Sequence, residues 1–331
     1  MTENKRIVLA SRPMGMPTAD NFRLEHVPVP SPGPEEVLVK VEMISIDPAM
    51  RGWMNEGTTY IRGVMLGEVM RAFAAGRVVY SQHPAVAEGD YVSGLLGVQT
   101  YAIVPAEQLT RLDLSLGPLE WHLGVLGMPG MTAYFGLLER GKPKAGETVF
   151  VTGAAGIVGA TAGQIAKIKG CRVVGSAGSD EKCRFLVEEC GFDGAIQYKT
   201  EDVDRRLKEL CPEGIDILYD NVGGDILDVG LAHLARGARV VICGAISQYN
   251  EPRMRGPSNY MKIVTARATL TGIIVFDFQE QYPEAVRQLA QWLNSGQLHT
   301  RTDFVEGIEH FYPALMKLYT GTNFGKVVLK V

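Results

Sequence analysis

The stretch from Thr148 to Lys167 reads TVFVTGAAGIVGATAGQIAK, and it decides the fold. An apolar run typical of a β-strand leads into a glycine-rich turn, and a segment with helical apolar spacing follows. A strand, a glycine turn and a helix in this order form a phosphate-binding element, because the free N–H groups and positive dipole end of the helix stabilise a pyrophosphate. The stretch therefore predicts a dinucleotide-binding domain.

The glycines of this turn match the G-x-G-x-x-G pattern in part. Gly156 and Gly159 hold its last two positions, and Ala154 stands in the first. We expect Gly156, Ile157, Val158 and Gly159 to contact the pyrophosphate, since a residue without Cβ lets the backbone approach it. The alternative is that the glycines only let the helix pack closely on the strand.

Six strand-like runs alternate with helical stretches from Thr148 onward. They are TVFVT at 148–152, RVVGS at 172–176, GAIQY at 194–198, IDILY at 215–219, RVVIC at 239–243 and LTGIIV at 270–275. Parallel strands need crossover connections, and these are usually helices. The alternation predicts the α/β class, with a Rossmann-type, doubly wound parallel sheet and helices such as Ile157–Lys169 on both faces.

The N-terminal part of the chain has a different pattern of apolar segments and turns. Between residues 6 and 104, short apolar segments alternate with turns rich in Pro and Gly, which is typical of a small β-barrel or sandwich. The tail reads strand, helix, strand, and we expect it to return to this barrel. We therefore predict a domain of residues 1–122 and 299–331, and a dinucleotide-binding domain of residues 123–298.

Composition narrows the range of partners and locations. The 331 residues carry a formal net charge of -4 with Lys and Arg scattered, so neither nucleic acid nor an anionic membrane is an expected partner. No apolar run is long enough to span a bilayer, and the start MTENKRIVLASRP lacks a signal-peptide core. Five cysteines without a C-x-x-C pair are expected to be reduced thiols. We expect a soluble, cytoplasmic protein.

The loop after the second strand indicates which dinucleotide is bound. An enzyme using NADH has an acidic residue about 20 residues beyond the turn, and here Ser176 stands at that distance. The loop AGSDEKCR at 177–184 offers Ser179 and Lys182 as donors to a 2′-phosphate. Its two acidic residues are explained as the first residues of a helix. The loop predicts NADPH, with Lys182 as the main phosphate ligand.

Several longer strings together resemble the zinc-independent medium-chain dehydrogenase/reductase family, in its branch of prostaglandin reductases, leukotriene B4 12-hydroxydehydrogenases and curcumin reductases. The strings are VLGMPGMTAYFGLLERGKPKAGETVFVTGAAGIVG at 125–159, GSDEKCRFL at 178–186, YDNVGG at 219–224, CGAISQYN at 243–250 and TNFGKVVLKV at 322–331. The resemblance covers nearly the whole chain. It implies a GroES-like β-barrel domain joined to a Rossmann domain, NADPH as cofactor, and a homodimer.

The resemblance also implies roles for individual residues. Lys182 and Tyr198 would hold the 2′-phosphate end, and Asn221 would lie along the cofactor. Thr132 would hydrogen-bond the carboxamide, with a helix N-cap as the alternative. The residues expected to line the nicotinamide half are Cys243, Gly244, Ala245, Ile246, Ser247, Tyr249, Ile274, Val275, Phe276 and Asn323.

One string departs from the family pattern. Relatives usually read D-P-Y-M-R-G, whereas this chain has Ala49 in place of the tyrosine in its string at 47–52. The departure indicates that an aromatic wall of the substrate cleft is missing.

The sequence predicts no metal site. Zinc-dependent alcohol dehydrogenases that share this fold need a cysteine and a G-H-E motif as zinc ligands. The N-terminal half of this chain has no cysteine, and where G-H-E might stand it reads Leu66, Gly67, Glu68. The six histidines show no clustered spacing. Alcohol oxidation needs a Lewis acid for the developing alkoxide, whereas conjugate reduction needs only hydrogen-bond donors for an enolate.

The expected reaction is NADPH-dependent reduction of the carbon–carbon double bond of an α,β-unsaturated ketone or aldehyde. The hydride goes to the β-carbon, and Tyr249 stabilises or protonates the enolate. Tyr249 has the alternative role of a rim residue that only covers the nicotinamide. Two other readings of the chain stay open, an NADPH:quinone reductase and a non-catalytic NADPH-binding protein.

Overall fold

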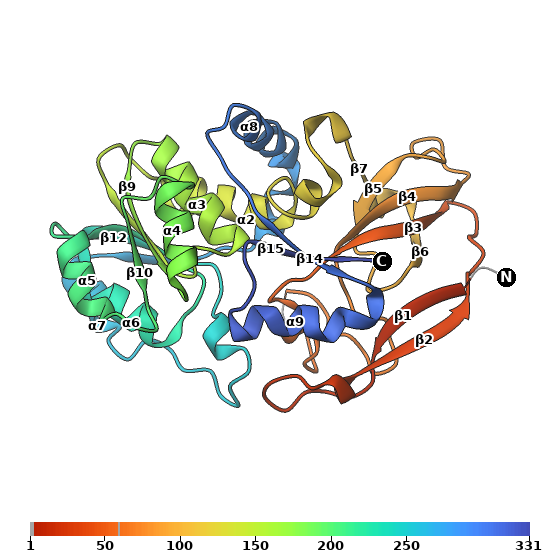
Figure 1. The fold of residues 1–331 in the computed structure, drawn as a ribbon, viewed down its shortest axis with the longest axis horizontal. Helices are drawn as coiled ribbons and strands as arrows, with labels where there is room; N and C mark the ends of the chain where they lie inside the picture. The colour runs from red at the N-terminus through yellow and green to blue at the C-terminus, as the bar shows by residue number, and fades with distance from the viewer. Residues whose placement is uncertain (1–2, 59) are drawn as a thin grey trace. The chain divides into compact units, whose positions relative to one another are not determined.

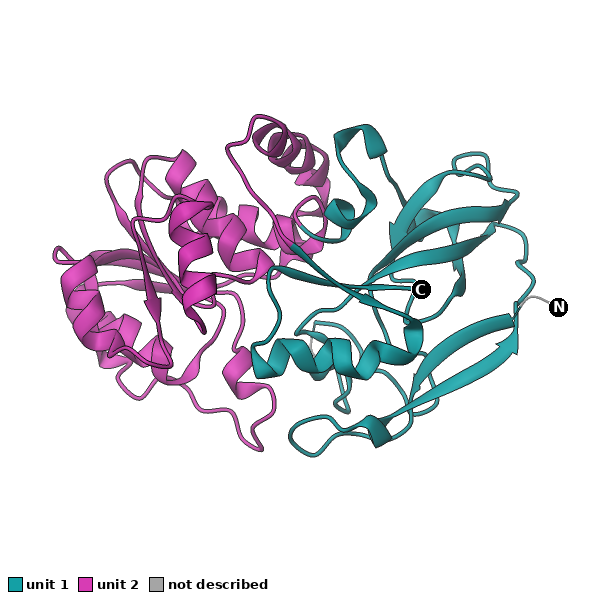
Figure 2. Cartoon of the chain, in the orientation of Figure 1, with its two compact units in different colours: residues 1–124, 302–331 teal, residues 125–301 magenta. Residues whose placement is uncertain are grey.

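The computed structural model describes residues 3–58 and 60–331, which fall into two compact units (Figure 2). The first unit consists of residues 1–124 together with residues 302–331, and the second of residues 125–301. The C-terminal segment thus belongs to the same unit as the N-terminal half. Each unit has its own sheet.

The second unit contains a six-stranded parallel sheet, and all six predicted strands are confirmed. They are β8 (Thr148–Val151), β9 (Arg172–Ala177), β10 (Gly194–Gln197), β11 (Ile215–Asp220), β12 (Leu234–Ile242) and β13 (Thr269–Gly272). Their spatial order is β10-β9-β8-β11-β12-β13, with every neighbouring pair parallel. The order reverses between β8 and β11, which is the switch point where such sheets bind nucleotides.

Helices form a layer on each face of this sheet (Figure 1). α2 packs on α3, whereas α5 and α7 both pack on α6. The helices are α2 (Met128–Phe135), α3 (Ile157–Ile168), α4 (Asp180–Glu188), α5 (Val203–Leu210), α6 (Gly224–Ala232), α7 (Met261–Ala266) and α8 (Tyr282–Asn294). The predicted helix after the glycine turn is therefore confirmed as α3, and Gly170 follows it with a φ of 81° that favours glycine. Among the described residues, no helix is both long and apolar enough to cross a membrane.

The first unit contains a seven-stranded mixed sheet beside a two-stranded hairpin. The hairpin pairs β1 (Glu3–Leu9) with β2 (Phe22–Pro28). The sheet runs β14-β15-β3-β4-β5-β7, with β6 also paired to β3. Its strands are β3 (Glu36–Ser45), β4 (Ala74–Ser81), β5 (Tyr91–Gly94), β6 (Tyr101–Pro105), β7 (Thr110–Arg111), β14 (Thr302–Glu306) and β15 (Lys326–Lys330), and its helices are α1 (Met50–Trp53) and α9 (Phe311–Thr320).

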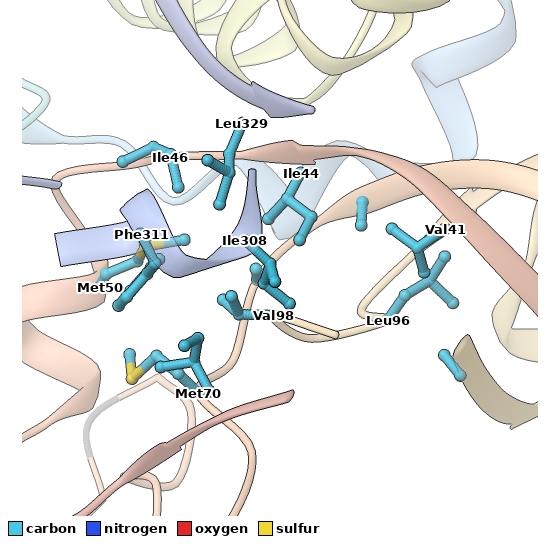
Figure 3. Packing of buried hydrophobic residues seen from close by; sticks show 14 of the residues in the cluster. Val41, Ile44, Ile46, Met50, Met70, Leu96, Val98, Ile308, Phe311 and Leu329 are labelled. Atoms are coloured by element: carbon cyan, nitrogen blue, oxygen red, sulfur yellow. The ribbon is translucent and has the colours of Figure 1, made fainter. Parts of the chain in front are cut away.

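The apolar core of the first unit joins residues from both ends of the chain. Figure 3 shows Ile44, Ile46, Phe311 and Leu329 among the side chains that gather there. Phe311 also meets Phe22 of the hairpin edge-on, with ring centroids 5.1 Å apart. Because β15 pairs with β3 and α9 packs into this core, the tail completes the N-terminal fold.

Candidate cofactor and active site

Apart from Thr132, which lies in α2, the predicted cofactor residues of the second unit lie at one edge of its sheet. Each group directly follows a strand: Gly156 follows β8, Ser179 and Lys182 follow β9, Tyr198 follows β10, Asn221 follows β11, Cys243 to Tyr249 follow β12, and Ile274 to Phe276 follow β13. The carboxyl ends of parallel strands share an edge, so the fold brings together residues that are more than a hundred positions apart in the sequence.

The glycine turn is built by three residues with different tasks. Gly153 makes the tight turn with a φ of 59°, a conformation that favours glycine. Sequence reasoning had matched Ala154 to the first position of the pattern and had given Gly153 no task. Gly159 lets α3 approach the turn, since a Cβ on it would lie 2.6 Å from the Gly153 carbonyl oxygen. Gly156 is the N-cap of α3 and has no side chain to cover the helix start.

This turn fits a pyrophosphate. The first N–H groups of an α-helix have no partner within the helix, and a helix dipole favours negative charge at that end. α3 is 12 residues long and no side chain caps its start. Ile157 and Val158, in the first turn of α3, are half-buried. The residues present can therefore hold the diphosphate of NADPH through backbone N–H groups.

A buried carboxylate ties the turn after β8 to the loop after β11. The Thr152 hydroxyl donates to an Asp220 carboxylate oxygen at 2.6 Å, and the same hydroxyl accepts from the Asn221 backbone N–H at 2.9 Å. The Gly223 N–H donates to the other Asp220 oxygen at 2.9 Å. Burial raises the pKa of Asp220 against the effect of these hydrogen bonds. The network fixes Asn221, whose side-chain amide donates to the Thr152 carbonyl at 2.8 Å.

The end expected to hold the 2′-phosphate lies where β9 and β10 finish. Ser179 is the N-cap of α4 and accepts the Lys182 N–H at 3.3 Å, so the acidic residues that follow it lie in the first helical turn, as predicted. The Tyr198 hydroxyl lies 3.0 Å from where a Cβ on Gly178 would stand, and Lys199 lies beside the same point. Burial raises the pKa of Tyr198. Lys199 adds a cation that sequence reasoning missed.

The loop after β12 is fastened to the loop after β11. The Ser247 hydroxyl donates to the Val222 carbonyl at 2.7 Å. Further along, the Tyr249 hydroxyl accepts the Ala245 N–H at 3.2 Å and lies 3.0 Å from where a Cβ on Gly244 would stand. The phenol oxygen of Tyr249 therefore lies back over Gly244 and Ala245, while Ile246 begins a short 3-10 helix.

Thr132 does not cap a helix. The N-cap of α2 is Gly127, and Thr132 lies within the helix, where its hydroxyl donates to the Met128 carbonyl at 2.8 Å. Its own carbonyl accepts from the buried Tyr219 hydroxyl at 2.9 Å. The N-cap alternative was wrong because the N-cap of α2 lies five residues earlier, at Gly127. Contact with a carboxamide stays a prediction.

The remaining predicted residues differ in exposure. Burial raises the pKa of Cys243 to about 12, so its thiol is unreactive. Ile274 is exposed, Val275 is buried and Phe276 is half-buried. Asn323 belongs to the first unit, between α9 and β15, and its side-chain amide donates to the Gly325 carbonyl at 3.3 Å.

Comparison with known proteins decides the family. Residues 5–112 match a model described as the N-terminal domain of oxidoreductase, and residues 158–291 match one described as zinc-binding dehydrogenase. The chain is 43% identical to an NADPH-dependent curcumin reductase from Escherichia coli (strain K12), over 99% of this chain and 97% of that protein. It is 38% identical to a 2-alkenal reductase (NADP(+)-dependent) from Nicotiana tabacum, over the same shares. The crystal structure of CurA in complex with NADPH from Vibrio vulnificus shares 40% identity and a TM-score of 0.94, with 99% of each chain covered.

The chain belongs to the zinc-independent medium-chain dehydrogenase/reductase family. The resemblance found in the sequence is thereby confirmed, and so is its branch. One of the two matched models is named for zinc binding, yet within residues 3–58 and 60–331 no group of three or more His, Cys, Asp or Glu could hold a metal ion.

Two glycine variants separate the packing and binding tasks of the turn. We expect Gly159→Ala to lower the free energy of unfolding by roughly 1–3 kcal/mol, because its methyl would collide with backbone. Gly156→Ala should cost less than about 1 kcal/mol, since its methyl meets only the Gly153 oxygen at 3.4 Å, but it should weaken NADPH binding by covering the helix start. Chemical denaturation and NADPH fluorescence titration measure the two effects. Unimpaired NADPH binding by Gly156→Ala would contradict the assignment.

Proposed function

We propose that this chain is an NADPH-dependent reductase of the carbon–carbon double bond in α,β-unsaturated ketones and aldehydes. The observation that carries the proposal is the cradle at the carboxyl edge of the sheet, in a chain whose close relatives are named as curcumin and 2-alkenal reductases. Thr152 and Asp220 hold its two central loops together, and Lys182, Tyr198 and Lys199 supply polar groups at one end.

Tyr249 is the residue to which we assign the proton-donating role. Bound NADPH supplies the hydride that the β-carbon receives. A phenol hydroxyl can act as both a hydrogen-bond acceptor and a proton donor. The Ala245 N–H fixes the Tyr249 oxygen at 3.2 Å and would stabilise negative charge that develops on it as the proton leaves. Donation to the substrate carbonyl oxygen would stabilise the enolate and then protonate it.

An enone assay tests the reaction and the tyrosine together. The purified chain should consume NADPH when given 3-nonen-2-one. The loss of NADPH absorbance measures this consumption. Tyr249→Phe should lower kcat for the enone roughly 10²-fold and affect quinone reduction less, because it removes a donor to the developing oxyanion. Tyr260→Phe is the matched control, since this tyrosine is exposed at the start of α7.

Two outcomes would contradict the proposal. If no enone or alkenal in a panel causes loss of NADPH, the reductase function is wrong. If NADPH binds but neither enones nor quinones are reduced, the chain is a binding protein. If Tyr249→Phe loses enone and quinone reduction equally, Tyr249 is not the specific donor to the enolate. That result would leave the proposed reductase function standing.

Lys182 should determine the preference for NADPH over NADH. Loss of one charged phosphate contact removes roughly 1.5–3 kcal/mol, so Lys182→Ala should raise KM for NADPH by about ten- to a hundredfold and leave KM for NADH unchanged. Lys169→Ala serves as the control, because Lys169 lies at the opposite end of α3 from the glycine turn. Equal changes for both coenzymes would show that Lys182 has another task.

We also propose a homodimer, formed by pairing of β13 with its copy. β13 is the edge strand of the six-stranded sheet, and an edge strand offers unpaired backbone groups to another strand. Its Leu270 is 42% exposed, and the neighbouring α7 exposes Met261 and Val264. Antiparallel pairing of two copies would be self-complementary and would cover these side chains. Sedimentation should give a dimer for the wild type and a monomer for Leu270→Lys, with Leu114→Lys, in the other unit, as the control.

A cytoplasmic location belongs to the same proposal. All five cysteines are free, and burial raises the pKa of each of them to about 11 or 12. Unpaired and unreactive thiols suit a reducing compartment, where a reductase also meets NADPH. Cell fractionation with an antibody checks the location.

A further inference from the structure

Lys326, the first residue of β15, is a lysine held out of solvent. It is 2% exposed, and desolvation lowers its pKa. A buried ammonium group is costly unless it is paired and hydrogen-bonded. Sequence reasoning gave this residue no task, although it stands in the closing string TNFGKVVLKV.

The ammonium group of Lys326 binds the start of a single segment. It donates to the Ile46 carbonyl at 2.6 Å and pairs with one Asp47 carboxylate oxygen at 3.0 Å. The Ser45 hydroxyl donates to the other oxygen of the same carboxylate. The backbone adds a contact, since the Ile46 N–H donates to the Val327 carbonyl at 3.1 Å. These contacts fix the chain where β3 ends.

The segment fixed in this way leads directly into α1. The Asp47 carbonyl accepts the Met50 N–H at 3.1 Å, and the Ala49 carbonyl accepts the Trp53 N–H at 3.1 Å. Ala49 stands between these contacts, at the position where the family pattern has a substrate-facing tyrosine. A shift of Asp47 would therefore move the helical turn that carries Ala49.

The residues just before Lys326 include Asn323, which is predicted to line the nicotinamide half of the cofactor. Asn323 lies three residues earlier, and its amide bonds the Gly325 carbonyl at 3.3 Å. The Phe324 N–H donates to Asp303, which also pairs with Lys317 of α9, so the turn is held from its other side. One short stretch thus joins a predicted cofactor residue to the substrate segment.

A gain in stability does not by itself explain the buried ion pair between Lys326 and Asp47. Replacing a buried ion pair by neutral groups of similar size is often neutral or stabilising, because desolvation offsets the attraction between the charges. A single ammonium that binds both a backbone carbonyl and a carboxylate, in contrast, defines one geometry for the segment that holds it.

We propose that Lys326 is a positioning residue, which holds the segment Ile46–Arg51 in a fixed place relative to the turn Asn323–Gly325 and thereby sets the geometry of enone binding. The link to enones rests on the proposed function. The positioning itself rests only on contacts within the first unit.

Three variants test this proposal. Lys326→Met removes the ammonium but keeps a long apolar side chain. Lys326→Met combined with Asp47→Asn also removes the unpaired carboxylate, so that it folds even where the single variant does not. Lys330→Met is the matched control, because Lys330 lies on the same strand and pairs with the exposed Glu306.

Two measurements follow the variants. The enone kcat/KM should fall about tenfold or more in both Lys326 variants, because a small displacement of a positioning segment is costly, while the Kd for NADPH stays unchanged. Hydrogen exchange can be measured without any enzymatic turnover. It should be faster than in the wild type at the amides of Met50, Arg51 and Trp53 in both variants. Lys330→Met should match the wild type in each measurement.

Two results would overturn the proposal. Wild-type exchange of residues 46–53 in the double variant would show that the ammonium does not fix the segment. Wild-type kcat/KM in the double variant would show that Lys326 only balances the charge of Asp47. If the wild type reduces no enone, the proposed function fails, and hydrogen exchange alone decides the role of Lys326.

Discussion

No side chain fits between the start of α3 and the turn that follows β8, and the cofactor site depends on this constraint. A Cβ on Gly159 would stand 2.6 Å from the Gly153 oxygen, so only glycine allows the helix to begin this close to the strand. Because Gly156 also lacks a side chain, the first N–H groups of α3 stay uncovered at the carboxyl edge of the sheet. The buried Asp220 then brings the loop after β11 to the same place, through the hydroxyl of Thr152.

The two units have different kinds of sheet, and each kind serves a different purpose. The sheet of the second unit is parallel, so its loops converge at one edge and can hold an extended cofactor. The mixed sheet of the first unit is completed by β14 and β15 from the end of the chain, and Phe311 and Leu329 fill its core. The tail also brings Lys326 to the end of β3, where its charge is neutralised by Asp47.

Local patterns explain the successes of sequence reasoning, and their limits explain its errors. Apolar periodicity predicted the parallel strands and α3, and glycine spacing predicted the phosphate-binding turn. Long matching strings identified the family. All of these are patterns of residues that are neighbours in the sequence. Ala154 holds the first position of the G-x-G-x-x-G pattern, but the pattern does not say which residue has positive φ, and in the structure that residue is Gly153. Thr132 was misjudged as a possible N-cap because helix ends are poorly marked by sequence.

The sequence by itself determined the fold class, the glycine turn and the choice of family, since these depend on neighbouring residues and on their order along the chain. Only the tertiary structure decided which distant groups meet, because a side chain's partners depend on strand order and burial. The bond between Thr152 and Asp220 joins residues 68 positions apart, and that between Lys326 and Ile46 joins residues 280 positions apart. No local pattern marks such pairs, because the low-dielectric interior that strengthens their hydrogen bonds exists only in the folded protein.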